Sequence, residues 1–234
     1  MKIASEKDIK GVLSVLKRKG YKIFERPYEL NIVGMRTSSM PNSFDDKIHV
    51  FWKEKDGKWK GYIFPATTDA GTYWLKNPMQ VDGTAILKEG QYVNAYQIGL
   101  HQNSYSALTQ KGKVTILRDY DRDAIFDFNT VKQESGYYGI NIHRATASGS
   151  SKTVDKWSAG CQVLQNSGDF DTLMDLAEKH KNLYGNSFTY TLIDERAFIR
   201  TLKRRSIYTI GGISLIAFAI MYYYRKQADK LLNL

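Results

Sequence analysis

Apolar side chains recur every three or four positions in two segments of the chain, which is the spacing of one face of an α-helix. The first segment covers residues 5–19, and Ser5 stands where its hydroxyl would cap the first turn. The second covers residues 169–180, with Asp169 in the capping position. The pattern therefore predicts an amphipathic helix at the start of the domain and another late in it.

The segment from residue 21 to residue 120 follows a different pattern, in which β-branched, aromatic and polar residues form short runs. The runs 48–52 and 59–64 flank Asp56-Gly57, a pair that favours the tight turn of a β-hairpin. We therefore expect an α+β fold that is β-rich, with few helices, formed as one domain by residues 1–195. Further runs with the character of strands cover 92–98, 113–118, 139–143 and 187–193.

Residues 207–224 form an uncharged, apolar stretch of 18 residues. At about 1.5 Å per residue a helix of this length spans roughly 27 Å, which matches the hydrocarbon core of a bilayer. Basic residues lie on both sides of it, and three consecutive tyrosines end it where interfacial aromatic residues are common. The sequence thus predicts a basic linker over 196–206, a C-terminal transmembrane helix over 207–224 and a short basic tail over 225–234.

The chain is strongly basic, with 34 Lys and Arg residues against 24 Asp and Glu and a formal charge of +10. Such a charge suits nucleic acid, anionic lipid or an anionic cell-wall polymer, and it does not choose among them. We find neither a metal-ligand spacing nor a glycine-rich phosphate loop, so we expect no cofactor and no metal. Cys161 is the only cysteine, so no intrachain disulfide is possible.

The residues most suited to catalysis lie at the two ends of a loop. His143 ends a predicted strand, and a segment rich in Ser, Gly and Thr leads from it to Gly160-Cys161. A cysteine nucleophile needs an imidazole within hydrogen-bond reach and backbone N–H groups directed at the developing oxyanion. Gly160 permits the close backbone approach that such a site requires.

The order of His143, a loop of 14 residues and Ser158-x-Gly160-Cys161 resembles the signature of the L,D-transpeptidases, β-rich cysteine enzymes of peptidoglycan. The resemblance covers residues 137–165, and divergent, phage-encoded members of the family share the most with it. It implies a β-sandwich or barrel catalytic domain, with Cys161 as the acyl-accepting nucleophile and His143 as its base. It also implies that Ser158 and Gly160 shape the site, largely through backbone groups.

The chain departs from the family pattern at two positions. Ala159 stands where the family has a His before Gly-Cys, and Gln162 begins a segment without the Arg that often follows the Cys. His101, which comes after a predicted strand, is a candidate for the role of the missing His. A structural role for His101 stays open as well.

Three residues are candidates for binding the substrate. Arg144 adjoins the base, and its planar guanidinium suits a carboxylate, although a surface ion pair would explain it too. Trp157 begins the segment that leads to the cysteine, and His101 completes the set.

The resemblance implies an enzyme that acts on peptidoglycan stem peptides through a thioester on Cys161. An amine acceptor would give transpeptidation and water would give hydrolysis, which the likeness to phage proteins favours. Two alternatives stay open: a sortase-like transpeptidase, in which the His and the Cys lie farther apart, and a noncatalytic membrane-anchored virion or scaffold protein. Ala159 is the feature that keeps the noncatalytic alternative open.

The expected partners are peptidoglycan and a lipid bilayer, with no nucleic acid; the sequence does not identify a protein partner. Charged residues occupy the N-terminal segment where a signal peptide would be apolar, so we expect no signal peptide. The flank before the apolar stretch is also the more basic one. We therefore expect a single-pass membrane protein whose catalytic domain lies on the cytoplasmic side or in a virion membrane.

Overall fold

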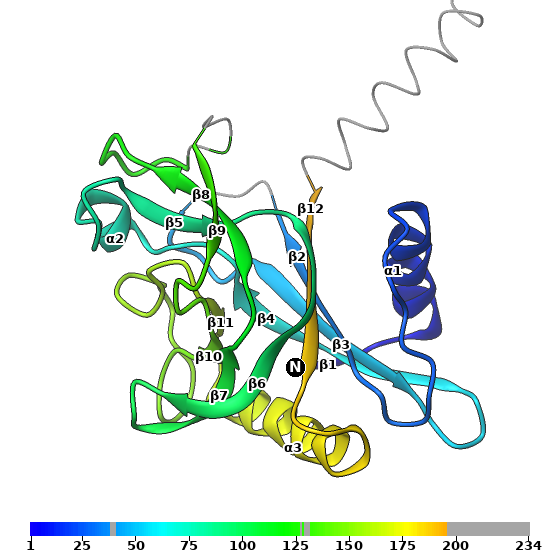
Figure 1. Ribbon diagram of the computed structural model, residues 1–234. Coiled ribbons are helices and arrows are strands. Elements are labelled where there is room, and N and C mark those ends of the chain that lie inside the picture. Colours follow the sequence, from blue (N-terminus) through cyan, green and yellow to red (C-terminus); the bar gives the residue numbers. More distant parts are fainter. Residues whose placement is uncertain (38–40, 127, 129–131, 196–234) are drawn as a thin grey trace, which may run out of the picture. The chain divides into compact units, whose positions relative to one another are not determined.

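The computed structural model describes residues 1–37, 41–126, 128 and 132–195, and Met1–Asp194 form one compact unit (Figure 1). The predicted transmembrane helix over 207–224 and the segments on either side of it, 196–206 and 225–234, lie outside the described residues. In the part that is described, no helix is long and apolar enough to cross a membrane.

The described unit is rich in strands and has few helices, in agreement with the predicted α+β, β-rich class. In chain order the elements are β1 (Lys2–Ile3), α1 (Glu6–Arg18), β2 (Asn31–Arg36), β3 (Asp46–Lys53), β4 (Trp59–Thr67), α2 (Thr72–Lys76), β5 (Thr84–Leu87), β6 (Gly90–His101), β7 (Tyr105–Gln110), β8 (Val114–Asp119), β9 (Gln133–Gly136), β10 (Ile142–Arg144), β11 (Gln162–Leu164), α3 (Ser167–Tyr184) and β12 (Phe188–Asp194).

The larger of two sheets closes on itself. Its strands are hydrogen-bonded in the order β4-β11-β10-β7-β6-β12-β2-β3, and β3 pairs again with β4 to complete the circuit. The short β1 joins β4 as well, with Lys2 opposite Ile63. Closure of a sheet pairs the strand edges and encloses an apolar interior. The smaller sheet has the order β5-β8-β9.

The predicted hairpin is confirmed. Strands β3 and β4 pair antiparallel from Asp46 opposite Ala66 to Lys53 opposite Trp59. In the turn, Gly57 has a φ of 81°, which residues with a Cβ rarely adopt.

Both predicted helices are present. At the start of α1, the hydroxyl of Ser5 accepts from the N–H of Asp8 at 3.2 Å, and the Asp8 carboxylate accepts from the N–H of Ser5 at 2.9 Å. The cap predicted for the later helix was wrong, because α3 begins earlier and Asn166 caps it. Asp169 instead pairs with the amino terminus of Met1 at 2.9 Å.

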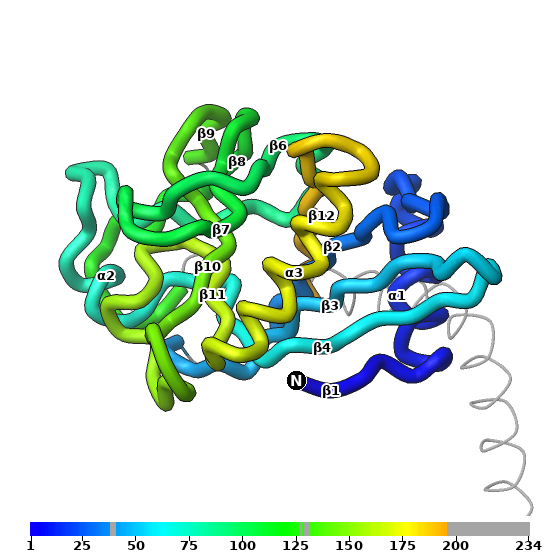
Figure 2. Tube along the Cα trace, turned by 90° about the horizontal axis from the view of Figure 1, so that it is seen from below, coloured from blue at the N-terminus to red at the C-terminus, as the bar shows by residue number. Residues whose placement is uncertain are grey.

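The two long helices cover different surfaces of the closed sheet. Figures 1 and 2 show α1 beside β2 and β3, and α3 crossing one end of the strands. The buried face of α3 joins the main core through Phe170, Leu173 and Ala177. The buried face of α1 forms a second cluster with outward-facing strand residues, namely Ile9, Val12 and Leu16 with Val33, Phe51 and Ile193.

Candidate active site

Two short neighbouring strands bring His143 and Cys161 together. Strands β10 and β11 pair in parallel, with His143 opposite Val163. Cys161 directly precedes β11, and the N–H of Gln162 donates to the carbonyl of Asn141 at 2.9 Å, so the ladder continues beyond β10. Because side chains alternate along a strand, His143, Val163 and Cys161 fall on one face of the pair.

The side chains of His143 and Cys161 come from neighbouring segments of the sheet. Within the described residues, no hydrogen bond joins the two side chains. A rise of about 3.3 Å per residue and a strand spacing of about 4.8 Å place their Cα atoms roughly 8 Å apart. That separation is within the combined reach of the two side chains.

The hydrogen bonds around His143 fix its tautomer. Its Nδ1 lies 2.9 Å from the carbonyl oxygen of Arg144, which can only accept, so Nδ1 carries the hydrogen. The hydroxyl of Tyr105 lies 3.4 Å from the same nitrogen. Nε2 therefore holds a lone pair, and nothing in the described part of the chain donates a hydrogen bond to it. Burial, together with the nearby His101, lowers the pKa of His143 to about 3.

His101 stacks on His143, with ring centroids 4.1 Å apart and planes inclined by 18°. Its tautomer is fixed through Asn141, whose Oδ1 accepts from the N–H of Gln110 at 2.9 Å and whose Nδ2 therefore donates to His101 Nδ1 at 3.0 Å. Burial lowers the pKa of His101 as well. Two imidazolium ions at this distance would repel each other, so a proton taken up by His143 requires His101 to stay neutral.

Cys161 is half-buried and held by weak contacts. Its Sγ lies 3.4 Å from the N–H of Asn141 and 3.4 Å from the carbonyl of Gly139. The side chain packs against an apolar cluster that includes Phe44 and Val154. Burial raises the pKa of the Cys161 thiol to about 11. At neutral pH the site therefore holds a neutral thiol beside a neutral imidazole.

Ser158 and Gly160 shape the turn that leads to Cys161. The Oγ of Ser158 donates to the carbonyl of Cys161 at 2.8 Å and accepts from the N–H of Gly160 at 3.1 Å. Ser158 thus supports this turn through its side chain, and its backbone carbonyl accepts from the N–H of Gly71 at 2.9 Å. Gly160 has a φ of 122°, and a Cβ at this position would lie 2.3 Å from the carbonyl oxygen of Ala85.

Gln162 anchors the backbone next to Cys161 to the core, a role that was not predicted from the sequence. Its side chain is fully buried, and its amide donates to the carbonyls of Thr68 and Gly160 at 3.4 and 3.3 Å. The hydroxyl of Tyr190 donates to its Oε1 at 2.8 Å. The one sign in the sequence was that Gln162 begins the segment in which the L,D-transpeptidase pattern often has an Arg after the Cys.

One cavity, of about 420 Å³, is lined by His143 and by the three residues predicted to bind substrate. His101, His143, Arg144 and Trp157 all contribute to its lining. The guanidinium of Arg144 lies 4.4 Å from the centre of the Tyr105 ring, a cation–π contact that holds it in the same cavity as His143. Arg144, His101 and Trp157 therefore share one space with His143.

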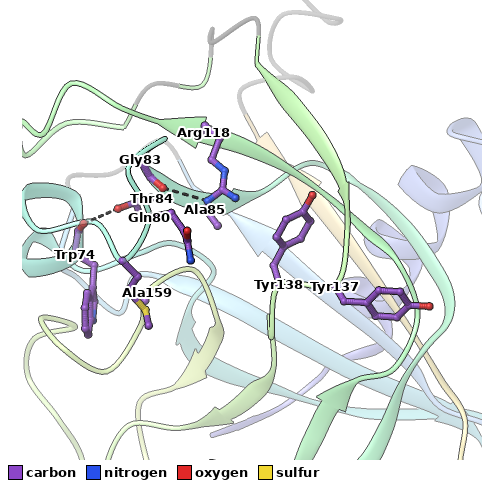
Figure 3. A pocket seen from close by; sticks show the side chains of 10 residues that line it. Trp74, Gln80, Gly83, Thr84, Ala85, Arg118, Tyr137, Tyr138 and Ala159 are labelled. Carbon is purple, nitrogen blue, oxygen red and sulfur yellow. Dashed lines mark hydrogen bonds between the residues drawn. The ribbon is translucent and has the colours of Figure 1, made fainter.

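A second cavity, of about 410 Å³, is lined in part by the segment that leads to Cys161 (Figure 3). Ala159 contributes to its lining, as do Ala85 of β5 and Tyr138. Trp157 and Ala159 are two residues apart, so the segment before Cys161 borders both cavities. The linings of these two cavities do not include Cys161 itself.

Among the described residues, no group of three or more His, Cys, Asp or Glu side chains is arranged to hold a metal ion. Comparison of the chain with protein-family models, with curated proteins and with solved structures gave no match.

Proposed function

We propose that this chain is a cysteine enzyme that acts on peptidoglycan stem peptides through a thioester on Cys161. The observation that supports the proposal is the fixed tautomer of His143, which commits Nδ1–H to the Arg144 carbonyl and leaves the Nε2 lone pair open. This nitrogen belongs to a side chain on the same face as Cys161, on the adjoining strand. A base fixed in this way is what a neutral thiol needs as it attacks.

The proposed reaction moves one proton and exchanges one bond. The thiol proton of Cys161 passes to Nε2 of His143 while Sγ bonds to the carbonyl carbon of the substrate peptide. The C–N bond then breaks, and the leaving amine takes the proton from the imidazolium. Because the pKa of the thiol is raised and that of the imidazole is lowered, proton transfer accompanies the attack on the carbonyl.

The oxyanion of the intermediate requires donors close to the sulfur. The backbone N–H of Cys161 forms no hydrogen bond to any described residue, whereas the N–H of Gly160 is taken by Ser158. We assign the Cys161 N–H as the oxyanion donor. An amine or water then attacks the thioester, giving transpeptidation or hydrolysis.

The sequence supports attachment of this domain to a membrane through residues 207–224. Carbonate extraction of membranes from expressing cells tests this part of the proposal. The full chain should stay in the membrane pellet, and deletion of 207–224 should release it. Release of the full chain by carbonate would contradict the anchor.

A noncatalytic protein is the second candidate, and one observation favours it. The thiol of Cys161 packs against apolar side chains and has a raised pKa, as expected of a cysteine that only fills space. Mass spectrometry of purified peptidoglycan fragments incubated with the full chain separates the two candidates. We expect new cross-linked or shortened stem peptides, and none with Cys161→Ala. Products that are equal for both chains would exclude the cysteine mechanism, and an absence of products would favour the noncatalytic candidate.

A further inference from the structure

The cavity beside Ala159 contains a buried cation that the proposed reaction does not use. Arg118 of β8 is only 7% exposed, yet its guanidinium borders the cavity. Figure 3 shows Arg118 reaching toward Gly83, with Ala159 on the loop across the cavity. Among the described lining residues it is the only charged one, and aromatic side chains of Trp74, Tyr137 and Tyr138 accompany it.

The guanidinium of Arg118 uses only some of its N–H groups in hydrogen bonds within the described part of the protein. Its Nε and Nη2 donate to a single oxygen of Glu134, at 3.3 and 3.1 Å, and its Nη1 donates to the carbonyl of Gly83 at 3.1 Å. A guanidinium has five N–H groups. Two of them, one on each terminal nitrogen, therefore have no acceptor in the described part of the protein.

The charge of Glu134 is shared with a second cation. Lys132 lies 3.4 Å from Oε1 of Glu134, while Arg118 uses Oε2. Glu134 is also more exposed than Arg118, so water screens it more strongly. Lys132 also pairs with Asp82 at 2.7 Å, so two cations and two carboxylates form one ion-pair cluster, and Arg118 is the member of it that borders the cavity.

We propose that this cavity binds a carboxylate of the peptide substrate through Arg118, with the neighbouring aromatic rings covering the apolar part of the peptide. The inference rests on the proposed function and adds the substrate's chemical class, a peptide with a free carboxylate near the reacting carbonyl. Two remaining N–H groups on a partly desolvated guanidinium suit a carboxylate better than a neutral amide. Ala159 places this cavity two residues from Cys161.

Calorimetric titration of the full-length Cys161→Ala chain tests the proposal without requiring turnover. The probes are the tetrapeptide L-Ala-γ-D-Glu-L-Lys-D-Ala and two amidated forms, one at the D-glutamyl α-carboxylate and one at the C-terminus. One of the two amidations should weaken binding by about 10- to 100-fold, the size expected for losing a charged hydrogen-bond acceptor. Adding Arg118→Gln should weaken the free peptide equally and remove the discrimination.

Glu134→Gln in the same background is the matched control. It breaks the ion pair of Arg118 but leaves the guanidinium in the cavity, so binding of the free peptide should be retained or strengthened. Equal affinity for all three peptides, or an equal loss from Arg118→Gln and Glu134→Gln, would overturn the proposal. Thioester formation by the chain with an intact Cys161 is measured separately. Failure of the carboxylate-binding proposal can therefore be distinguished from failure of the proposed cysteine chemistry.

Discussion

Two buried histidines in different regions of the domain show how a structural imidazole differs from one suited to catalysis. His180, on α3, is packed against the ring of Phe188, and its Nδ1 accepts from the N–H of Leu30 at 3.1 Å. The backbone of Ser187 also hydrogen-bonds to the ring. His143, on β10, commits only Nδ1 and leaves Nε2 open beside a cavity.

Both histidines are almost fully buried, so burial does not distinguish them. They differ in whether a ring nitrogen is left without a hydrogen bond from the described protein. His143 and His180 are 4% and 5% exposed, and burial lowers the pKa of both. A ring nitrogen that is open beside a cavity can accept a proton or a hydrogen bond from a ligand, whereas the protein itself already binds the ring of His180 at Leu30 and Ser187. Burial alone would have assigned both residues the same role.

The largest expected effect comes from removing each imidazole in turn. His143→Gln should slow acylation of Cys161 by about 10²–10⁴, because it removes general-base assistance. His180→Gln should lower stability but leave the acylation rate of the folded chain close to that of wild type. Single-turnover kinetics on stem peptides, with folding checked by circular dichroism, measure both. Equal slowing by the two variants would mean that His143 is as structural as His180.

The next prediction concerns the reactivity of the thiol. Because the pKa of Cys161 is about 11, roughly one thiol in a thousand is ionised at pH 8. Alkylation by iodoacetamide should be slow there and should accelerate roughly tenfold per pH unit up to about pH 10. The urea-unfolded chain, labelled in parallel, serves as the control with an ordinary thiol. A plateau below pH 9 in the folded chain would show a thiolate paired with His143 at rest.

A smaller effect is expected in acid. The pKa of His143 is about 3 in the folded chain against 6.5 for an ordinary histidine, so between these values the unfolded chain binds the extra proton. Stability should therefore fall as the pH drops below 6.5, with His143 contributing up to about 1.4 kcal/mol per pH unit. Urea unfolding at pH 7, 6 and 5 should show a shallower loss for His143→Gln. Parallel curves for the variant and wild type would contradict the buried neutral imidazole.

The sequence predicted the parts of the fold that depend on local signals. The hairpin around Asp56-Gly57 and the helix after Ser5 are present because turn and capping residues act within a few positions of themselves. Strand β11 was missed, since its three residues carry too little pattern to distinguish them from a loop. The closed order of the strands depends on long-range pairing, which no local pattern encodes.

The sequence was enough to select Cys161 and His143 as candidates, but it did not predict their surroundings. Cys161 and His143 are identified by residue type and order along the chain. Their surroundings arise where distant strands meet. Examples are the stacking of His101 on His143, the hydrogen bond from the Asn141 amide to His101, and the position of Arg118 at the second cavity. Asn141 lies two residues before His143, and this spacing on a predicted strand was the only local sign of a shared face.

The central claim is that Cys161 is acylated by a stem peptide with His143 as its base. Intact-mass spectrometry of the full chain, quenched in acid shortly after mixing with stem tetrapeptide, tests it directly. The account predicts a mass increase equal to one peptide minus its leaving group, located on Cys161 by digestion and removed by hydroxylamine. It predicts no adduct on Cys161→Ala and a much slower one on His143→Gln. An unmodified Cys161 in a chain that still cleaves or joins the peptide would contradict the account.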